Sequence, residues 1–263
     1  MARAAKKAAK KAAKKAAKKA AKKGANKSAK TKLASRKRPT KRSATKRPTV
    51  KRPAAKQSTA KPLDLYVAHR DEYVAPTAPV LVDVGPARYL GITGRGEPGG
   101  AAFTEAVGAL YNVAFTVKMA RKFAGTVYTV SKLEALWWGS GADNDFMFQP
   151  RDQWNWQLLI RTPEFITTTE IGDAIATLRA RGKPGRVSDV GLVTIEEGSC
   201  VQMLHIGPYT EEWRSIESMH ALADQEGRDV HGRHHEIYLS DPRRVAPAKL
   251  RTILRLPVES RRE

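Results

Sequence analysis

The stretch VQMLHIGPYTEEWRSIESMHALADQ, residues 201–225, contains the change of pattern that decides the fold. Residues 201–206 form a short apolar run typical of a buried strand, and after a Gly-Pro pair the sequence favours a helix over 210–225. Two further segments, 235–240 and 250–256, favour strands. This part of the chain therefore predicts a strand–helix–strand–strand unit.

The residues before this unit repeat the same order. A strand is expected near 80–94, a helix near 103–123, and strands near 128–138 and 154–161, with an extra helix at 169–181 between the halves. Two such units packed side by side predict an α+β domain with antiparallel sheets and helices on one face. The opposite face is then expected to form a ligand groove along the pseudo-twofold axis.

The positive charge of the chain is concentrated at its N-terminal end. The 263 residues contain 48 Lys and Arg and 26 Asp and Glu, which gives a formal net charge of +22. Twenty-five of the basic residues, and none of the acidic ones, lie between Met1 and Lys61. We therefore expect two parts: a disordered polycationic tail at 1–61, and a nearly neutral folded domain at 62–263 that holds every aromatic residue.

The tail is low-complexity sequence, with five AAKK tetrads over 4–23 followed by three KRP triplets. It has no apolar stripe to pack and no aromatic residue to stack on bases, so we expect it to bind DNA non-specifically through counterion release. The residues expected to contact nucleic acid are Lys6, Lys7, Lys10, Lys11, Lys14, Lys15, Lys18, Lys19, Lys22, Lys23, Arg38, Arg42, Arg47 and Arg52. A solubilising tail and attraction to anionic lipid are the alternatives.

The composition of the tail resembles the tails of linker histones and of bacterial nucleoid proteins, which implies compaction or tethering of DNA. No apolar run is long enough to span a membrane, and the basic N-terminus lacks the apolar segment of a secretory signal. A single cysteine, Cys200, rules out an intramolecular disulfide and fits a reducing compartment. The expected location is the cytoplasm, in association with the nucleoid.

The strand HHEIYLS at 234–240 carries candidate chemistry. Alternation along a strand puts Glu236 and Tyr238 on one face and His235 and Ile237 on the other. If the apolar set lies under the helices, Glu236 and Tyr238 face the groove. A carboxylate desolvated among aromatic residues would have a raised pKa and could act as a general base. The alternative is a solvated glutamate on a surface strand.

Aromatic residues gather on the strands that flank the expected groove. Their number suits a flat aromatic or cationic ligand, although each indole could equally belong to the core. The candidate ligand-binding residues are Trp137, Trp138, Trp154, Trp156, His234 and a second carboxylate, Glu134. Tyr209 could bond a ligand carbonyl or close a helix cap. The four histidines at 205, 231, 234 and 235 lack metal-ligand spacing, so neither a metal nor another cofactor is expected.

Five strings in the folded part resemble the GyrI-like small-molecule-binding family, and together they cover most of 62–258. They are ALYNVAFTVKM at 109–119, LEALWW at 133–138, WNWQLLIRTPEFIT at 154–167, EEGSCVQMLHIGPYTEE at 196–212 and HHEIYLSDPRR at 234–244. The resemblance implies a drug-binding pocket between the two halves, with Glu236 as its key carboxylate. Stand-alone relatives with this kind of strand include hydrolases that open the cyclopropane ring of DNA-alkylating natural products.

Two functional hypotheses follow. In the first, the domain binds a bulky electrophilic or planar drug, and in the hydrolase version Glu236 activates water while Tyr209 or Tyr238 supports charge on the ligand oxygen. Whether such a protein is an enzyme or only sequesters its ligand is left open by the sequence. In the second, the protein is a nucleoid-associated or DNA gyrase-modulating protein without catalytic activity. The tail would tether either version to DNA.

Overall fold

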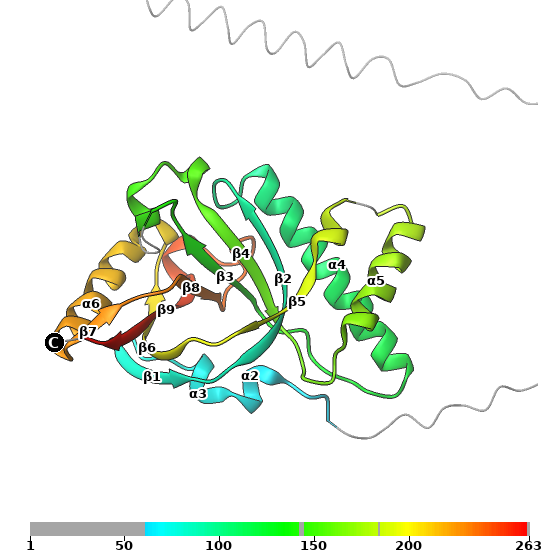
Figure 1. Ribbon diagram of the computed structural model, residues 1–263, viewed down its shortest axis with the longest axis horizontal. Helices are drawn as coiled ribbons and strands as arrows, with labels where there is room; N and C mark the ends of the chain where they lie inside the picture. The colour runs from blue at the N-terminus through cyan, green and yellow to red at the C-terminus, as the bar shows by residue number, and fades with distance from the viewer. Residues whose placement is uncertain (1–60, 142–144, 184, 262–263) are drawn as a thin grey trace, which may run out of the picture. The chain divides into compact units, whose positions relative to one another are not determined.

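The protein has the predicted α+β architecture (Figure 1). The computed structural model describes residues 61–141, 145–183 and 185–261, so the expected tail lies outside the described residues except for Lys61. Nine strands form the sheet among these residues, and all nine pair antiparallel. The strand order is β1-β6-β9-β8-β3-β4-β2-β5, and β7 pairs with β9 outside this path.

Two strand–helix–strand–strand units make up most of the sheet, as the sequence predicts. The first unit consists of β2 Ala87–Arg95, α4 Ala101–Phe123, β3 Leu133–Trp138 and β4 Asn155–Arg161. The second consists of β6 Gly198–Ile206, α6 Glu212–Gln225, β8 His234–Tyr238 and β9 Arg251–Ser260. The units meet where β3 pairs with β8, with Glu134 opposite Ile237. The pseudo-twofold axis therefore runs between these two strands.

The outer strands cross between the units. β1 (Val80–Val84) leads directly into β2 but pairs with β6, and β5 (Gly191–Ile195) leads into β6 but pairs with β2. The single strand expected over 80–94 is thus two strands, because Gly85 and Pro86 interrupt the ladder. The short strands β5 and β7 (Arg228–Val230) were not predicted from the sequence.

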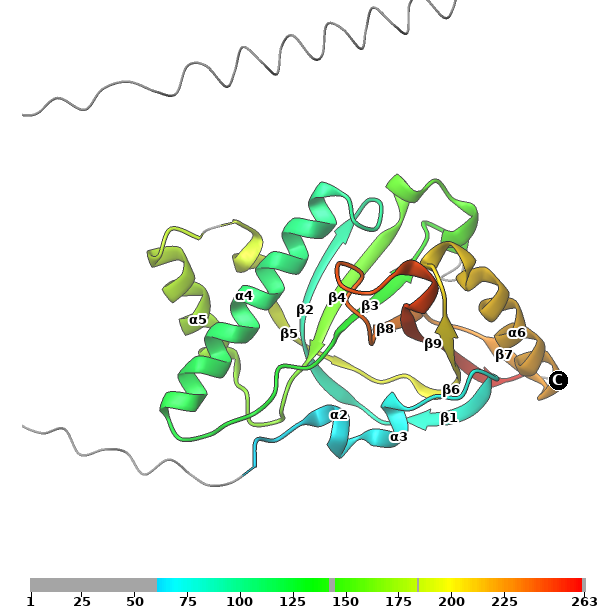
Figure 2. The same cartoon turned by 180° about the vertical axis from the view of Figure 1, so that it is seen from behind.

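Three long helices cover one face of the sheet, which we call the helix face (Figure 2). The third of them, α5 (Thr168–Ala180), lies between the units in sequence and begins with a capping box formed by Thr167 and Glu170. α4 packs on β2 and β4, α5 packs on α4 and β5, and α6 packs on β6 and β9. Two adjoining apolar clusters therefore form the core under these helices.

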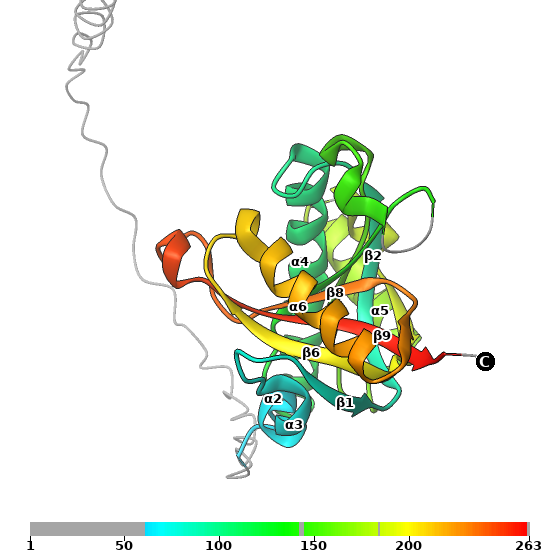
Figure 3. The same cartoon turned by 90° about the vertical axis from the view of Figure 1, so that its left-hand side faces the viewer.

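The other face of the sheet, which we call the opposite face, is also covered. Two single-turn helices, α2 (Leu65–Ala68) and α3 (Arg70–Tyr73), lie beneath it on the side away from α6 (Figure 3). The side chains of Leu65 and Tyr73 are buried there. The segment before β1 therefore covers part of the face on which the sequence predicts the ligand groove.

Five 3-10 turns complete the described elements. They are η1 Asp145–Phe148, η2 Arg151–Gln153, η3 Gly185–Asp189, η4 Tyr209–Glu211 and η5 Pro247–Lys249. η4 leads directly into α6, and η5 leads into β9. The connection from β8 to β9, which contains η5, lies between α4 and α6 in Figure 2.

Candidate functional site

Strand β8 carries charged side chains to both faces of the sheet. Glu236 is opposite Ala135 on β3 and Leu254 on β9, and these apolar residues belong to the clusters under α4 and α6. His235 is opposite Arg255 and therefore points the other way. Glu236 and Tyr238 thus lie on the helix face, and His235 lies on the opposite face.

This assignment reverses one expectation from the sequence. Ile237 was expected under the long helices, but it packs with Leu204, Ile253 and Tyr73 of α3 on the opposite face. Alternation along β8 is as expected, and only the choice of face differs. The reason is that both faces of the sheet are covered, so an apolar residue does not identify the side on which the long helices lie.

On the helix face, Glu236 lies within a group of aromatic hydroxyl groups. The Trp137 indole N–H donates to the Tyr238 hydroxyl oxygen at 3.3 Å. Burial, together with the charge of Glu236 and a hydrogen bond to it, raises the pKa of the Tyr238 hydroxyl well above its ordinary value. The ring of Tyr209 meets that of Tyr238 edge to face, with centroids 5.9 Å apart. A Trp137–Tyr238–Glu236 chain of polar contacts therefore crosses the centre of the sheet.

His234 lies next to Glu236 on the same face. Its Nε2 atom is 3.5 Å from Glu236 Oε1, and its ring is 5.6 Å from the ring of Phe146. The side chain is 1 % exposed, and neither ring nitrogen has a hydrogen-bond partner in the part of the chain that the structure describes. Buried polar atoms without a partner are costly, so this histidine marks a place where a bound molecule or water would be stabilised.

Glu212, the first residue of α6, was not among the candidates predicted from the sequence. Its side chain is buried at 6 % exposure, and its Oε1 atom has no hydrogen-bond partner among the described residues. Burial raises the pKa of the Glu212 carboxyl well above its ordinary value, and the charge of Glu236 adds to this effect. The helix start after GPYTEE was recognised, but the direction of the Glu212 side chain becomes apparent only when α6 is placed on the sheet.

Tyr209 lies at the edge of this group, in η4, and is 37 % exposed. Burial, followed by the charges of Glu212 and Glu236, raises the pKa of its hydroxyl to about 12. The hydroxyl is therefore a proton-bearing donor at neutral pH. We call Tyr209, Glu212, Glu236 and Tyr238 the acidic cluster.

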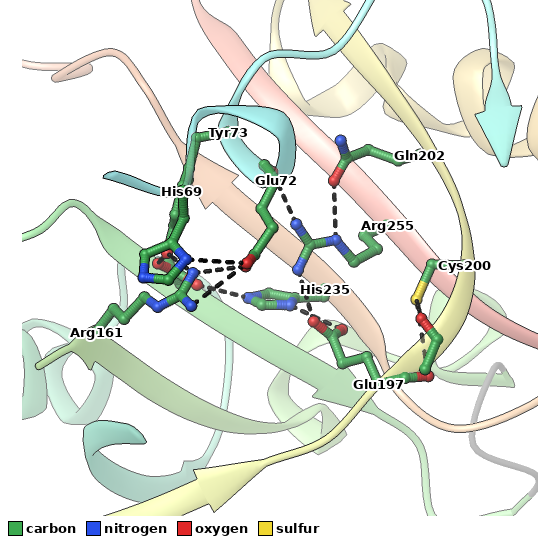
Figure 4. Close-up of polar contacts among 11 residues, drawn as sticks. His69, Glu72, Tyr73, Arg161, Glu197, Cys200, Gln202, His235 and Arg255 are labelled. Atoms are coloured by element: carbon green, nitrogen blue, oxygen red, sulfur yellow. Dashed lines mark hydrogen bonds and ion pairs between the residues drawn. The ribbon is translucent and has the colours of Figure 1, made fainter. Parts of the chain in front are cut away.

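On the opposite face, a second set of charged groups forms ion pairs with one another (Figure 4). His235 Nδ1 is 2.9 Å from Glu197 Oε1, and its Nε2 is 3.1 Å from Glu134 Oε2. Arg255 donates to Glu197 at 2.6 Å, and the Tyr73 hydroxyl donates to Glu134 at 2.9 Å. Each of these carboxylates therefore has a cationic partner.

The network continues to the edge of the sheet through Arg161, which pairs with Glu72 of α3. Arg255 also donates to the Glu72 carbonyl and to the Gln202 side chain, both at 2.9 Å. We call Glu72, Glu134, Glu197, Arg161, His235 and Arg255 the balanced network, because it contains three carboxylates and three basic groups. It ties α3 to the sheet.

The pKa values of the balanced network reflect this pairing. Burial disfavours a charged His235, but the carboxylates of Glu197 and Glu134 outweigh it and raise the pKa of the imidazole to about 9. Burial likewise opposes charge on Glu197, but His235 and Arg255 lower its pKa to about 2. Glu134, a candidate ligand-binding residue from the sequence, belongs to this network and faces away from Glu236.

The four candidate tryptophans occupy three different environments. Trp156 is fully buried under α4, where its ring meets Phe103 edge to face. Trp154 is half-buried and packs on Trp137 and Phe146, within reach of the acidic cluster. Trp138 lies on the opposite face, with the Arg233 guanidinium 3.8 Å from its ring centre. The structure therefore brings Trp137 and Trp154, but not Trp138, to the side of Glu236.

Among the described residues, no three His, Cys, Asp or Glu side chains gather in a way that could hold a metal ion. None of the helices described is long and apolar enough to cross a membrane.

Comparison with known proteins adds the family. Residues 77–259 match the model of the GyrI-like small molecule binding domain. An uncharacterized conserved protein from Listeria innocua is similar at 36 % identity and a TM-score of 0.70, over 75 % of this chain and 100 % of that one. A hydrolase from Listeria innocua is similar at 34 % identity and a TM-score of 0.67, over 75 % of this chain and 100 % of its own.

A second hydrolase structure from Listeria innocua has 34 % identity and a TM-score of 0.68, over 76 % of this chain and 100 % of its own. A comparison with curated proteins gives no match. The family match spans more than half of the chain and includes both strand–helix–strand–strand units. The chain therefore belongs to the GyrI-like small-molecule-binding domain family.

Proposed function

We propose that the acidic cluster binds bulky aromatic electrophiles and that Glu236 catalyses their hydrolysis. The observation that carries this proposal is the contrast between the two faces of one sheet. The balanced network pairs every carboxylate with a cation, whereas Glu212 and Glu236 share the helix face without an Arg or Lys partner among the described residues. Uncompensated buried carboxylates are costly to the fold, and such groups concentrate at functional sites.

In this proposal each residue around Glu236 except Glu212 has a role. Glu236 accepts a proton from the attacking water, and the Tyr238 hydroxyl holds the Glu236 carboxylate in place. Tyr209 donates a hydrogen bond to the ligand oxygen. The rings of Trp137 and Trp154 offer stacking surface for a flat ligand. The ring nitrogens of His234, beside Glu236, are available to form a hydrogen bond with the ligand or with water.

The proposed substrates are cyclopropane-containing compounds that alkylate DNA. The likeness to two hydrolase structures at 34 % identity supports hydrolysis as the reaction class. The basic tail, residues 1–61, would hold the domain near duplex DNA, where such compounds accumulate. A flexible tether can raise the local concentration of the domain to about the millimolar range.

The test uses the simplest compound of this class, the spirocyclopropyl cyclohexadienone that water opens to 4-(2-hydroxyethyl)phenol. Wild-type protein should form this phenol faster than buffer does, and Glu236→Gln should lower the rate by about a hundredfold or more. Glu217→Gln, on the exposed side of α6, is the matched control and should keep the wild-type rate. Equal rates for wild type and a folded Glu236→Gln variant would remove Glu236 from the mechanism.

The tether is tested separately by measuring alkylation of duplex DNA. Full-length protein should protect DNA better than residues 62–263 at low salt, and the advantage should shrink at high salt because salt releases the tail. Equal protection at both salt concentrations would contradict the tethering part of the proposal.

A further inference from the structure

Glu212 is the buried carboxyl group that the roles above leave unused. Nothing among the described residues donates a hydrogen bond to its Oε1 atom, and no Lys, Arg or His forms an ion pair with it. The hydroxyl of Thr252 lies beside the carboxyl group. The titratable groups facing it are Glu236 and Tyr238 from β8 and Tyr209 from η4, with His234 beside Glu236.

These neighbours favour the protonated form of Glu212. Burial and the negative charge of Glu236 both oppose ionisation and raise its pKa well above the ordinary value for a glutamate. A protonated carboxyl group carries one O–H donor. The site therefore contains a carboxylic acid and a second carboxyl group on β8, as in sites that combine a general acid with a general base.

Hydrogen bonds of His205 fix the start of α6 and thereby the position of Glu212. His205 lies on β6 at 6 % exposure, and its Nε2 atom is 3.3 Å from the Pro208 carbonyl oxygen. A carbonyl only accepts, so Nε2 carries the proton, and in the neutral ring Nδ1 accepts from the Ser215 hydroxyl at 3.0 Å. His205 thus links the turn before Tyr209 to the first turn of α6, which begins at Glu212.

We propose that Glu212 is a proton donor opposite Glu236, and that it protonates the carbonyl oxygen of a neutral electrophile, where negative charge develops when water attacks. The inference rests on the proposed function and adds a second catalytic residue to it. A permanently cationic ligand would instead favour two ionised carboxylates. A neutral electrophile therefore requires the protonated form of Glu212, and a cationic ligand favours the ionised form.

In the spirocyclopropyl cyclohexadienone, water attacks a cyclopropane CH₂, so a C–O bond forms while one ring C–C bond breaks. The electron pair of that bond makes the six-membered ring aromatic and puts negative charge on the former carbonyl oxygen. Glu236 takes the proton lost by water, and Glu212 gives its proton to the phenolate. The product is 4-(2-hydroxyethyl)phenol, and proton exchange with solvent restores both carboxyl groups.

The kinetic test is the pH dependence of phenol formation by full-length protein. The acid form of Glu212 is present at low pH and is lost as the pH rises through its raised pKa, so the wild-type rate should fall on the alkaline side. Glu212→Gln cannot give up a proton. It should lower the best rate by about a hundredfold and should abolish the alkaline fall. Glu217→Gln should keep both the rate and the profile.

A direct measurement separates this inference from the proposed function. The ¹³C chemical shift of the Glu212 carboxyl group, assigned by comparison with Glu212→Gln, reports its protonation at pH 7. If Glu212 is protonated but the cyclohexadienone is not hydrolysed, the result supports a protonated Glu212 and contradicts the proposed hydrolysis. An ionised Glu212 at pH 7, or a Glu212→Gln variant with the wild-type rate and alkaline fall, would overturn the proton-donor role.

Discussion

The balanced network makes the free energy of unfolding depend on pH, and the size of this dependence follows from the raised pKa of His235. The pKa of His235 is raised from its ordinary value of 6.5 to about 9, mainly by Glu197 and Glu134 acting against burial. A group with a raised folded-state pKa contributes its full stability below the unfolded value and loses it as the pH rises through the folded value. The relevant window is therefore pH 6.5 to about 9.

The size of the effect follows from the shift. Each pKa unit corresponds to 1.36 kcal/mol, so the free energy of unfolding should fall by about 3 kcal/mol between pH 6.5 and 9.5. Stability is lost because a neutral His235 no longer balances the negative charges of the buried Glu134 and Glu197 carboxylates.

Urea unfolding of the full-length protein, followed by tryptophan fluorescence across pH 6 to 10, measures this fall. His235→Gln should be less stable at pH 6.5 and should lose most of the pH dependence, because the titrating group is gone. His231→Gln, at an exposed position, is the control and should follow the wild-type curve. A wild-type stability that stays level between pH 7 and 9.5 would refute the reasoning, as would an equal slope in His235→Gln.

Three further outcomes are expected. Arg255→Met should lower the free energy of unfolding by about 3–5 kcal/mol, because it leaves the buried Glu197 carboxylate short of a partner, and a loss under 1 kcal/mol in urea unfolding would contradict the pairing. Ser215→Ala should cost about 1 kcal/mol in the same assay and should shift the His205 ring ¹⁵N resonances, since a hydrogen bond is lost, whereas unchanged resonances would refute that bond. The isolated tail, residues 1–61, should bind duplex DNA of any sequence with a slope of log K against log salt of about −0.9 per phosphate contacted, and a shallow slope in titrations would contradict counterion release.

The order of the main elements could be predicted because each has a local signal. The apolar periodicity of 103–123 corresponds to α4, and the alternation in 234–240 correctly separates the residues of β8 into two sets, although each set lies on the other face from the one expected. The strands β5 and β7 were missed because they are short and depend on pairing with distant partners, β2 and β9. Local propensity carries little information about such edges.

The site was only partly predictable for a physical reason. Glu236 and Tyr238 share a strand, so alternation places them together. Glu212 joins them through the packing of α6 on the sheet, which depends on contacts far apart in the sequence. Glu134 has the same residue type and lies on an equally buried strand, yet it faces the balanced network, and no local pattern distinguishes the two faces when both are covered.

The most direct test of the central claim, that the acidic cluster is the ligand site, is a crystal structure of the protein with 4-(2-hydroxyethyl)phenol. We expect the phenol ring beside Trp137 on the helix face, its phenolic oxygen within hydrogen-bonding distance of Glu212, and its hydroxyethyl oxygen toward Glu236. A phenol bound elsewhere, with the groups around Glu236 closed on one another, would contradict the claim.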